Sequence, residues 1–231
     1  QKEIKNVMLF LQSYGVSTAY AAKIYREYGS ESIDKVRENP YRLADDIWGI
    51  GFKTADGIAG KMGYGKNDAR RCRSGILYTL GQLSDEGHVY AEREQLVQAA
   101  CTLLEADAAP VCEALERMIL SEELITEREA IYLPAFYHAE CGAARRLKEL
   151  AESAGRTLFT TELDPGVLTA ETGIDYDDVQ LAAIRQAVTS KVMVLTGGPG
   201  TGKTTTTQGI IAALKKAGLR VLLARSEERR V

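Results

Sequence analysis

The chain has 231 residues, of which 45% are hydrophobic and 26% are charged, and its formal net charge is −3. This composition is typical of a globular protein with room for two domains, and it excludes a uniformly basic nucleic-acid binder while leaving local basic patches open. No apolar run approaches the roughly 18 residues of a membrane span and no charged-then-apolar leader is present, so we expect a cytoplasmic protein without a membrane partner.

The cysteines and histidines give no sign of a metal or redox site. The cysteines are widely spaced and form no CxxC pair: Cys72, Cys101, Cys112 and Cys141. This spacing predicts neither zinc ligation nor a disulfide framework, and we expect reduced, mostly buried side chains. The two histidines, His88 and His138, have no obvious partner in the sequence, so we interpret both as structural.

Residues 1–66 have the pattern of two helical hairpins. Apolar positions from Val7 to Tyr28 fit two helices that are separated at residues 14–17, with Ser17 as the N-cap of the second. A related pattern follows at residues 47–59, where apolar residues alternate with glycines ahead of an alanine-containing helix. Together they predict a tandem helix-hairpin-helix region.

The second hairpin is the stronger candidate for DNA contact. Its glycines let the turn approach a DNA backbone, and N–H groups at the start of the following helix can hold a phosphate oxygen. We expect contacts that do not read the base sequence from Gly49, Ile50, Gly51, Lys53 and Thr54, with Lys61 as a further cation. The alternative is that the hairpins serve only as packing units. An apolar residue flanks the turn, so we interpret Trp48 as a core anchor.

Residues 67–154 predict a winged-helix-like helical domain. Helical patterns and strand-like pieces occur in the order helix, strand, helix, helix, strand, strand, at residues 69–83, 88–90, 92–104, 110–120, 124–126 and 130–133. Such domains bind DNA or act as rigid protein-interaction modules, and the third helix here is not basic. We interpret the cluster of Arg70, Arg71 and Arg73 as a solvated helix face.

A further helix at residues 135–154 is expected to close this region through an apolar face at helical spacing, formed by Tyr137, Cys141, Ala144, Leu147 and Leu150. Residues 155–174 then carry few helical signals and are interpreted as a connector. The remaining segment, residues 175–231, is predicted to be the beginning of an ATP-binding domain.

The most specific motif of the chain is a phosphate-binding loop in that last segment. It fits G-x-x-x-x-G-K-[ST] between an apolar strand pattern at residues 192–195 and a helical pattern, and consists of Gly197, Gly198, Pro199, Gly200, Thr201, Gly202, Lys203 and Thr204. Backbone N–H groups of such a loop surround nucleotide phosphates. We expect Lys203 to neutralise the phosphates and Thr204 to bind Mg²⁺, with Thr205 beside them in the ATP site. A glycine-rich packing turn is the alternative.

Gln180 begins an acid-capped helix that immediately precedes the strand of the phosphate loop. A carboxamide at this place can hydrogen-bond the adenine edge and so favour ATP. The alternative is a surface glutamine on an amphipathic helix, which would be the ordinary interpretation without the loop that follows.

Taken together, these segments resemble bacterial RecD-like DNA helicases of superfamily 1B. The resemblance is carried by residues 10–16, 38–44, 46–56 and 180–204, and it extends over nearly the whole chain. It implies a motor that uses ATP to move 5′ to 3′ on single-stranded DNA. Gln180, Lys203 and Thr204 match the adenine-contacting, phosphate-binding and magnesium-binding positions of that family.

The chain also departs from this family. After the strand pattern at residues 220–224 the family continues with a DNA-contacting motif, whereas this chain continues with residues 225–231. The acidic pair for magnesium, the arginine finger and the second motor domain do not follow, and the chain starts with Gln1, so we expect a fragment of a longer protein that is inactive alone. The expected fold is mainly α, with a truncated P-loop α/β (RecA-like) domain whose exposed strand edges favour self-association.

Three classes of function therefore stand side by side. The first is an ATP-dependent DNA helicase, represented here by part of its chain, with single-stranded or forked DNA as its partner. The second is a nucleotide-independent DNA-binding or protein-docking module. The third is an AAA+ type ATPase, which the glutamine helix and the hairpin region argue against.

Overall fold

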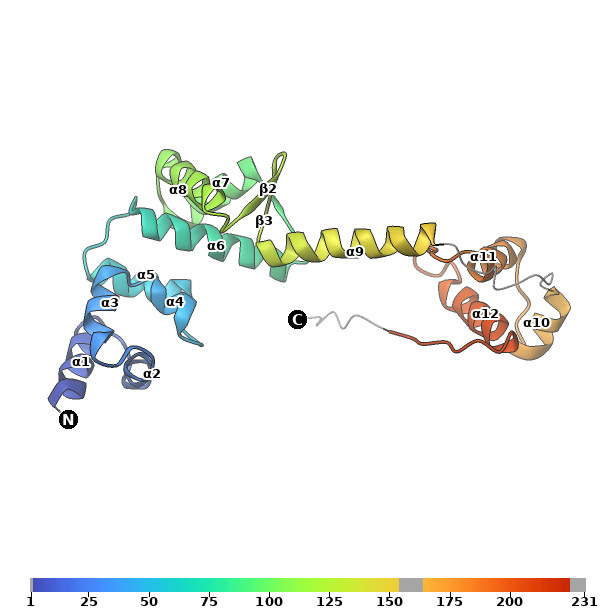
Figure 1. Cartoon of the computed structure of the whole chain (residues 1–231), viewed down its shortest axis with the longest axis horizontal. Helices are drawn as coiled ribbons and strands as arrows, with labels where there is room; N and C mark the ends of the chain where they lie inside the picture. The colour runs from blue at the N-terminus through green and yellow to red at the C-terminus, as the bar shows by residue number, and fades with distance from the viewer. Residues whose placement is uncertain (1, 154–163, 225–231) are drawn as a thin grey trace. The chain divides into compact units, whose positions relative to one another are not determined.

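The computed structural model describes residues 2–153 and 164–224, and its internal contacts divide the chain into two units, residues 1–140 and 141–231. The segment 225–231, where the sequence leaves the expected family pattern, lies outside the described residues. The first unit contains α1 (Lys2–Ser13), α2 (Thr18–Tyr28), the 3-10 turn η1 (Gly29–Glu31), α3 (Ser32–Glu38), α4 (Arg42–Asp46), α5 (Phe52–Lys61), α6 (Ala69–Asp85), β1 (Ala91–Glu92), α7 (Arg93–Leu104), α8 (Ala108–Leu120), β2 (Ile125–Glu127) and β3 (Ala130–Tyr132) (Figure 1).

The first helical hairpin is confirmed. The chain reverses between α1 and α2 at Gly15, where the positive φ of 80° suits a residue without a β-carbon. Ser17 then caps α2, because its hydroxyl accepts a hydrogen bond from the backbone N–H of Tyr20 at 3.3 Å. The two helices bury Val7, Leu11 and Ile24 in a core, here called the hairpin core, to which α3, α4 and the turn after α4 also contribute.

Helix α5 joins this hairpin core to a second core. Phe52, Ala55 and Ala59 recur at helical spacing and pack with the helices that follow, whereas Ile58 lies on the other side, in the hairpin core. The two cores of the first unit therefore meet at α5.

The winged-helix prediction is confirmed, with one strand displaced. Helices α6, α7 and α8 pack together, and the three strands form an antiparallel sheet in the order β1-β3-β2. The first strand was expected at residues 88–90 and is found at Ala91–Glu92, paired with Ile131 and Ala130. The hairpin between β2 and β3 turns at Arg128, which has a positive φ of 58°.

The arginine cluster at the start of α6 is not the solvated face that we expected. The Arg71 guanidinium binds both carboxylate oxygens of Asp56, at 2.7 and 2.9 Å, and both side chains are mostly buried. Arg73 binds Glu123 and, at 3.2 Å, Asp45. The arginines therefore link α4 and α5 of the hairpin region to the winged-helix-like helices.

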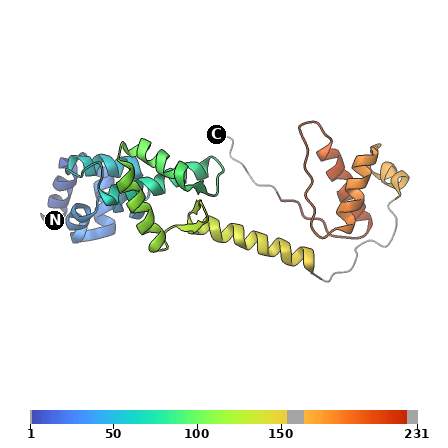
Figure 2. The same cartoon turned by 90° about the horizontal axis from the view of Figure 1, so that it is seen from above.

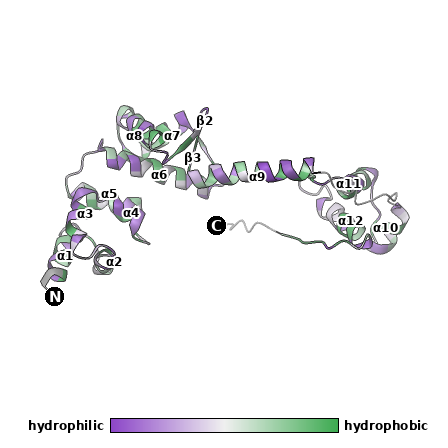
Figure 3. Cartoon of the chain, viewed as in Figure 1, coloured by the Kyte–Doolittle hydropathy of each residue, from purple (hydrophilic) through white to green (hydrophobic). Residues whose placement is uncertain are grey.

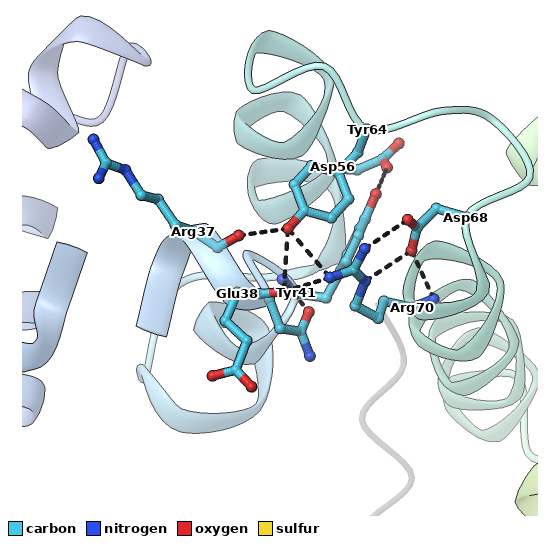
Figure 4. Close-up of polar contacts among 8 residues, drawn as sticks. Arg37, Glu38, Tyr41, Asp56, Tyr64, Asp68 and Arg70 are labelled. Carbon is cyan, nitrogen blue, oxygen red and sulfur yellow. Dashed lines mark hydrogen bonds and ion pairs between the residues drawn. The ribbon is translucent and has the colours of Figure 1, made fainter. Parts of the chain in front are cut away.

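Arg70 completes the same junction (Figure 4). Its guanidinium binds Asp68 and donates to the backbone carbonyl of Glu38 at 2.5 Å, while the Tyr64 hydroxyl donates to the carbonyl of Arg37 at 2.7 Å. The hydrogen bonds from Arg70 hold the pKa of the Asp68 carboxyl below its usual range. The C-terminal end of α3 is thus tied to the start of α6 by side chains that satisfy its carbonyls.

Helix α9 (Pro134–Glu152) begins where expected but does not close the first unit. Only its start packs on the sheet, where the Tyr137 ring lies 5.4 Å from that of Tyr132. Leu147 and Leu150, which we placed on a packing face, are both more than half exposed. Figure 3 shows hydrophilic residues alternating with apolar ones along this helix. The cysteine prediction also fails in part, because Cys112 and Cys141 are exposed.

The described part of the second unit is mainly helical. It contains α10 (Pro165–Thr172), α11 (Asp178–Thr189) and α12 (Lys203–Lys216), which lie side by side in Figures 1 and 2. Helix α10 corrects our interpretation of this stretch as a connector with few helical signals, since Asp164 caps it and Pro165 occupies the first turn. The part of the connector at 154–163 lies outside the described residues. None of the helices described is long and apolar enough to cross a bilayer.

The two strands predicted around the phosphate loop are absent from the described structure. Residues 191–202 and 217–224 contain bends, turns and extended backbone without a ladder. Val194 is 83% exposed, and Leu222 and Leu223 are exposed nearly as much. A strand is stable only when neighbouring strands satisfy its backbone groups, and no described segment pairs with these.

Candidate nucleotide-binding and DNA-binding sites

The phosphate loop lies directly before α12, as expected. Gly202 is the N-cap of that helix, with a left-handed φ of 75° that a side chain would strain, and no side chain caps the helix. The Lys203 ammonium group donates to the carbonyls of Gly197 and Gly198, at 2.5 and 2.6 Å. The cation therefore sits against the loop, where a phosphate would exchange for these carbonyls.

The other residues predicted for this site lie around the same loop. The Thr201 hydroxyl donates to the Gly198 carbonyl at 2.9 Å, which closes the turn, and Pro199 and Gly200 are exposed at its tip. Thr204 is exposed in the first turn of α12, and Thr205 beside it is half-buried. The hydroxyl of the next residue, Thr206, is used within the helix, since it donates to the Gly202 carbonyl at 3.0 Å.

Gln180 has a structural role that the sequence analysis did not name, as part of a capping box, and it also lies beside the loop. The side-chain oxygen of Gln180 accepts a hydrogen bond from the backbone N–H of Asp177 at 3.2 Å. The backbone N–H of Gln180 donates to the Asp177 carboxylate at 2.8 Å. This capping box orients the carboxamide. A β-carbon added at Gly202 would lie 2.4 Å from Gln180 Nε2, so the amide nitrogen points at the loop.

These residues fit a nucleotide with Mg²⁺. An added β-carbon at Gly197 would meet the Thr201 hydroxyl oxygen at 2.6 Å, so only glycine leaves this part of the loop open. A shallow cleft beside it is lined by Val179, Gln180, Ala183, Leu195, Thr196, Gly197, Thr201, Lys203 and Thr206. The cation of Lys203, the Thr201 hydroxyl, the N-terminus of α12 and the Gln180 amide thus gather around one loop, and these are groups that can bind a nucleoside triphosphate.

The second hairpin turn lies between α4 and α5 and is anchored from inside. Ile47 and Ile50 are buried on either side of it, so Ile50, which we predicted as a DNA contact, offers only its backbone. Gly49 has a positive φ of 95°, and Gly51 is the N-cap of α5 without any side-chain cap. Lys53 and Thr54 follow in the first turn and are exposed.

Our interpretation of Trp48 as a core anchor is wrong. Its side chain is 91% exposed at the tip of the turn. The turn is held from α2, because the Tyr20 hydroxyl donates to the Gly49 carbonyl at 2.8 Å and Lys23 Nζ donates to the Trp48 carbonyl at 3.2 Å. Sequence reasoning missed Tyr20 and Lys23 entirely, since neither lies near the turn along the chain.

Lys61, the further cation, lies at the first hairpin. A β-carbon at Gly15 would come within 2.1 Å of Lys61 Nζ, so the ammonium group fills the space beside that glycine. The last turn of α5 thereby approaches the turn between α1 and α2. Lys53, by contrast, is exposed, and its Nζ lies 5.9 Å from the centre of the Tyr78 ring.

Comparison with known proteins finds a match for each of the two segments that hold these candidate sites. Residues 1–90 match the family described as the ATP-dependent RecD2 DNA helicase HHH domain, and residues 180–230 match an AAA domain. The first match includes α6, which the arginine bonds tie to the hairpins. Over 94% of its length the chain is 26% identical to the ATP-dependent RecD2 DNA helicase of Deinococcus radiodurans, and it covers 32% of that protein.

The chain thus spans about a third of the length of the curated relative that it matches. Both hairpin turns lie within the first match, at residues 1–90. Lys203 of the phosphate loop lies within the second match, at residues 180–230. The chain is therefore similar to a RecD2 helicase in two separate parts: residues 1–90 resemble its helix-hairpin-helix domain, and residues 180–230, which hold the phosphate loop, resemble an AAA domain.

Proposed function

We propose that this chain carries the DNA-binding region and the first nucleotide-binding motif of an ATP-dependent DNA helicase that moves 5′ to 3′ on single-stranded or forked DNA. The observation that supports this most is the presence, in one chain, of a RecD2 hairpin region and a phosphate loop whose lysine and neighbouring glutamine both lie at the loop. A function on DNA is consistent with a cytoplasmic location.

In this proposal each residue of the loop has one task. Lys203 exchanges its two carbonyl partners for the β and γ phosphates, and the N-terminal end of α12 adds its partial positive charge. Thr204 would hold Mg²⁺, which neutralises charge on the phosphates during phosphoryl transfer. Gln180 would bind the adenine edge through an amide that is already oriented by Asp177.

We further propose that the 231 residues alone bind ATP weakly and hydrolyse it more slowly than a complete helicase does. The strand that should support the loop is unpaired, so the binding-competent arrangement is only a fraction of the ensemble and the apparent affinity falls by that fraction. The apolar stretches that remain exposed around the loop, such as Leu222 and Leu223, favour self-association of the chain.

Titration with a fluorescent ATP analogue tests the nucleotide site. We expect a dissociation constant well above the low-micromolar range, and Lys203→Ala should remove the residual binding because it deletes the cation at the loop. Lys216→Ala, at the other end of α12, is the matched control and should leave binding unchanged. Low-micromolar binding that is lost in Lys203→Ala would contradict weak binding by this chain, and binding that survives in Lys203→Ala would contradict the site itself.

Binding to labelled oligonucleotides over a salt series tests the DNA site. Because Lys53 is exposed beside the hairpin turn, Lys53→Ala should weaken binding and lower the slope of log affinity against log salt by about 0.7, the value for one phosphate contact on a single strand. Lys148→Ala, on the exposed part of α9, is the control. Absence of binding at low salt would favour the alternative in which the hairpin region docks a protein.

A further inference from the structure

We propose that Trp48 is a stacking platform for an unpaired DNA base at the tip of the second hairpin. This deepens the proposed function and rests on DNA binding by the hairpin region. Nothing in the fold requires an indole at this position, because the residue is 91% exposed while Ile47 and Ile50 on either side supply the buried anchors of the turn.

The turn that presents the indole is braced. Tyr20 and Lys23, one turn apart on α2, hold the carbonyls of Gly49 and Trp48 through hydrogen bonds of 2.8 and 3.2 Å. The backbone under Trp48 is thereby fixed on a helix that packs in the hairpin core. A braced aromatic side chain loses less conformational freedom on binding than one on a free loop, which favours a binding role.

The charges around the indole favour a nucleic acid as the occupant. Lys23 Nζ lies 5.5 Å from the centre of the Trp48 ring and 5.6 Å from that of Tyr20, so a cation stands over one face of the indole. The acidic residues nearest along the chain are already bound: Asp45 to Arg73, and Asp46 to the Tyr28 hydroxyl at 2.7 Å. A base on the indole with its phosphate at Lys23 is the arrangement that non-sequence-specific single-strand binders use.

A single exposed indole next to a lysine is a poor surface for a protein partner by comparison. Protein interfaces are centred on a contiguous apolar patch. Among described residues 1–66, the other large apolar side chains classed as exposed are Ile4 and Leu9, both on α1. The tip of the second hairpin thus offers one aromatic face and a positive charge, which match one base and its phosphate.

The experiment uses the fact that Trp48 is the single tryptophan of the chain, so intrinsic tryptophan fluorescence reports this position alone. Adding a single-stranded oligothymidylate to the whole chain should quench the fluorescence saturably. An oligonucleotide of equal length with abasic sites keeps the phosphates but lacks bases, and it should quench much less. Trp48→Ala should weaken binding of a labelled oligonucleotide about 5- to 150-fold, the range expected for loss of one base-aromatic stack.

Two variants serve as controls for this result. Trp48→Phe keeps an aromatic face and should restore most of the affinity, whereas Leu120→Ala removes an equally exposed apolar side chain from α8 and should change nothing. Equal quenching by the abasic strand, or unchanged affinity in Trp48→Ala while the parent chain binds DNA, would overturn the stacking proposal and leave DNA binding intact. If the parent chain binds no DNA at all, the proposed function of the hairpin region fails first. A Trp48→Ala effect confined to self-association would assign the indole to contact between copies and overturn the proposal.

Discussion

Replacing Arg71 with methionine should lower the free energy of unfolding of the first unit by about 2–4 kcal/mol. The guanidinium binds Asp56 through two hydrogen bonds and donates to the Leu104 carbonyl at 2.6 Å, and only 15% of the Arg71 side chain and 23% of that of Asp56 are exposed. Methionine preserves the apolar stem but removes the cationic partner of the Asp56 carboxylate and the guanidinium that donates to the Leu104 carbonyl. Removing one member of a mostly buried pair costs far more than the pair contributes when intact.

Arg117→Met is the matched control, because Arg117 forms its ion pair with Glu113 on an exposed helix face, with both side chains more than 60% exposed. Its expected effect is about 0.5 kcal/mol or less. Urea unfolding followed by circular dichroism measures both variants, and hydrogen exchange of α5 and α6 assigns the change to the junction. If both substitutions have equally small effects, the pair of Arg71 and Asp56 does not stabilise the packing of the hairpin region on the winged-helix-like helices.

Because the Tyr41 hydroxyl donates to Asp56, we also expect the stability of this junction to depend on pH in the alkaline range. Burial, together with a hydrogen bond of 2.8 Å to Asp56, raises the pKa of Tyr41 well above its usual range. A phenol whose pKa is raised on folding stabilises the protein fully below its unfolded pKa of about 10, and this contribution is lost as the pH rises beyond that value. The junction should therefore weaken above about pH 10, and Tyr41→Phe should reduce the pH dependence.

The helical elements could be predicted because their signals are local. The Ser17 cap and the apolar spacing of α1 and α2 are written within a few residues of each other, and so is the order of helices and strands in the winged-helix-like region. The phosphate loop and the Asp177 cap before it are equally local. In each of these cases the backbone is determined by neighbours along the chain, and the helices predicted from these signals are found.

The failures concern side chains whose partners are distant along the chain. Arg71 and Arg73 look like a solvated face until Asp56 and Glu123 are brought to them by the packing of α5 and α8. The apolar residue flanking the turn suggests that Trp48 is a core anchor, yet Ile47 and Ile50 already fill the inward positions of this short turn. Two buried neighbours so close to a glycine turn are the signal that could have shown the indole facing outward.

The prediction of a strand before the phosphate loop is wrong for a different reason. Its apolar residues have the right pattern, but a strand forms only by pairing, and the described residues contain no neighbour for it. The loop nevertheless keeps its lysine and glycine geometry, because these depend on α12 and on hydrogen bonds within the loop. The local motif can thus form without the sheet that would normally support it.

Two glycines of the same helix should respond to alanine in opposite directions. A β-carbon at Gly75 would lie 2.7 Å from both methyl carbons of Leu104, which is itself fully buried and cannot move aside. Gly75→Ala should therefore destabilise the first unit by about 1–3 kcal/mol through overpacking between α6 and α7. At Gly81 no atom lies within 4 Å of the added carbon, so Gly81→Ala should stabilise α6 by about 0.5–1 kcal/mol through helix propensity.

This pair separates packing from propensity because both substitutions add the same methyl group to α6. Urea unfolding of the two variants and the double variant measures them, and the double variant should fall between the two single ones. Restoring space with Leu104→Ala in the Gly75→Ala background should recover less than the clash costs, since deleting the leucine side chain leaves a cavity elsewhere. If Gly75→Ala is neutral or stabilising, α6 and α7 are not in the close contact on which the winged-helix-like core depends.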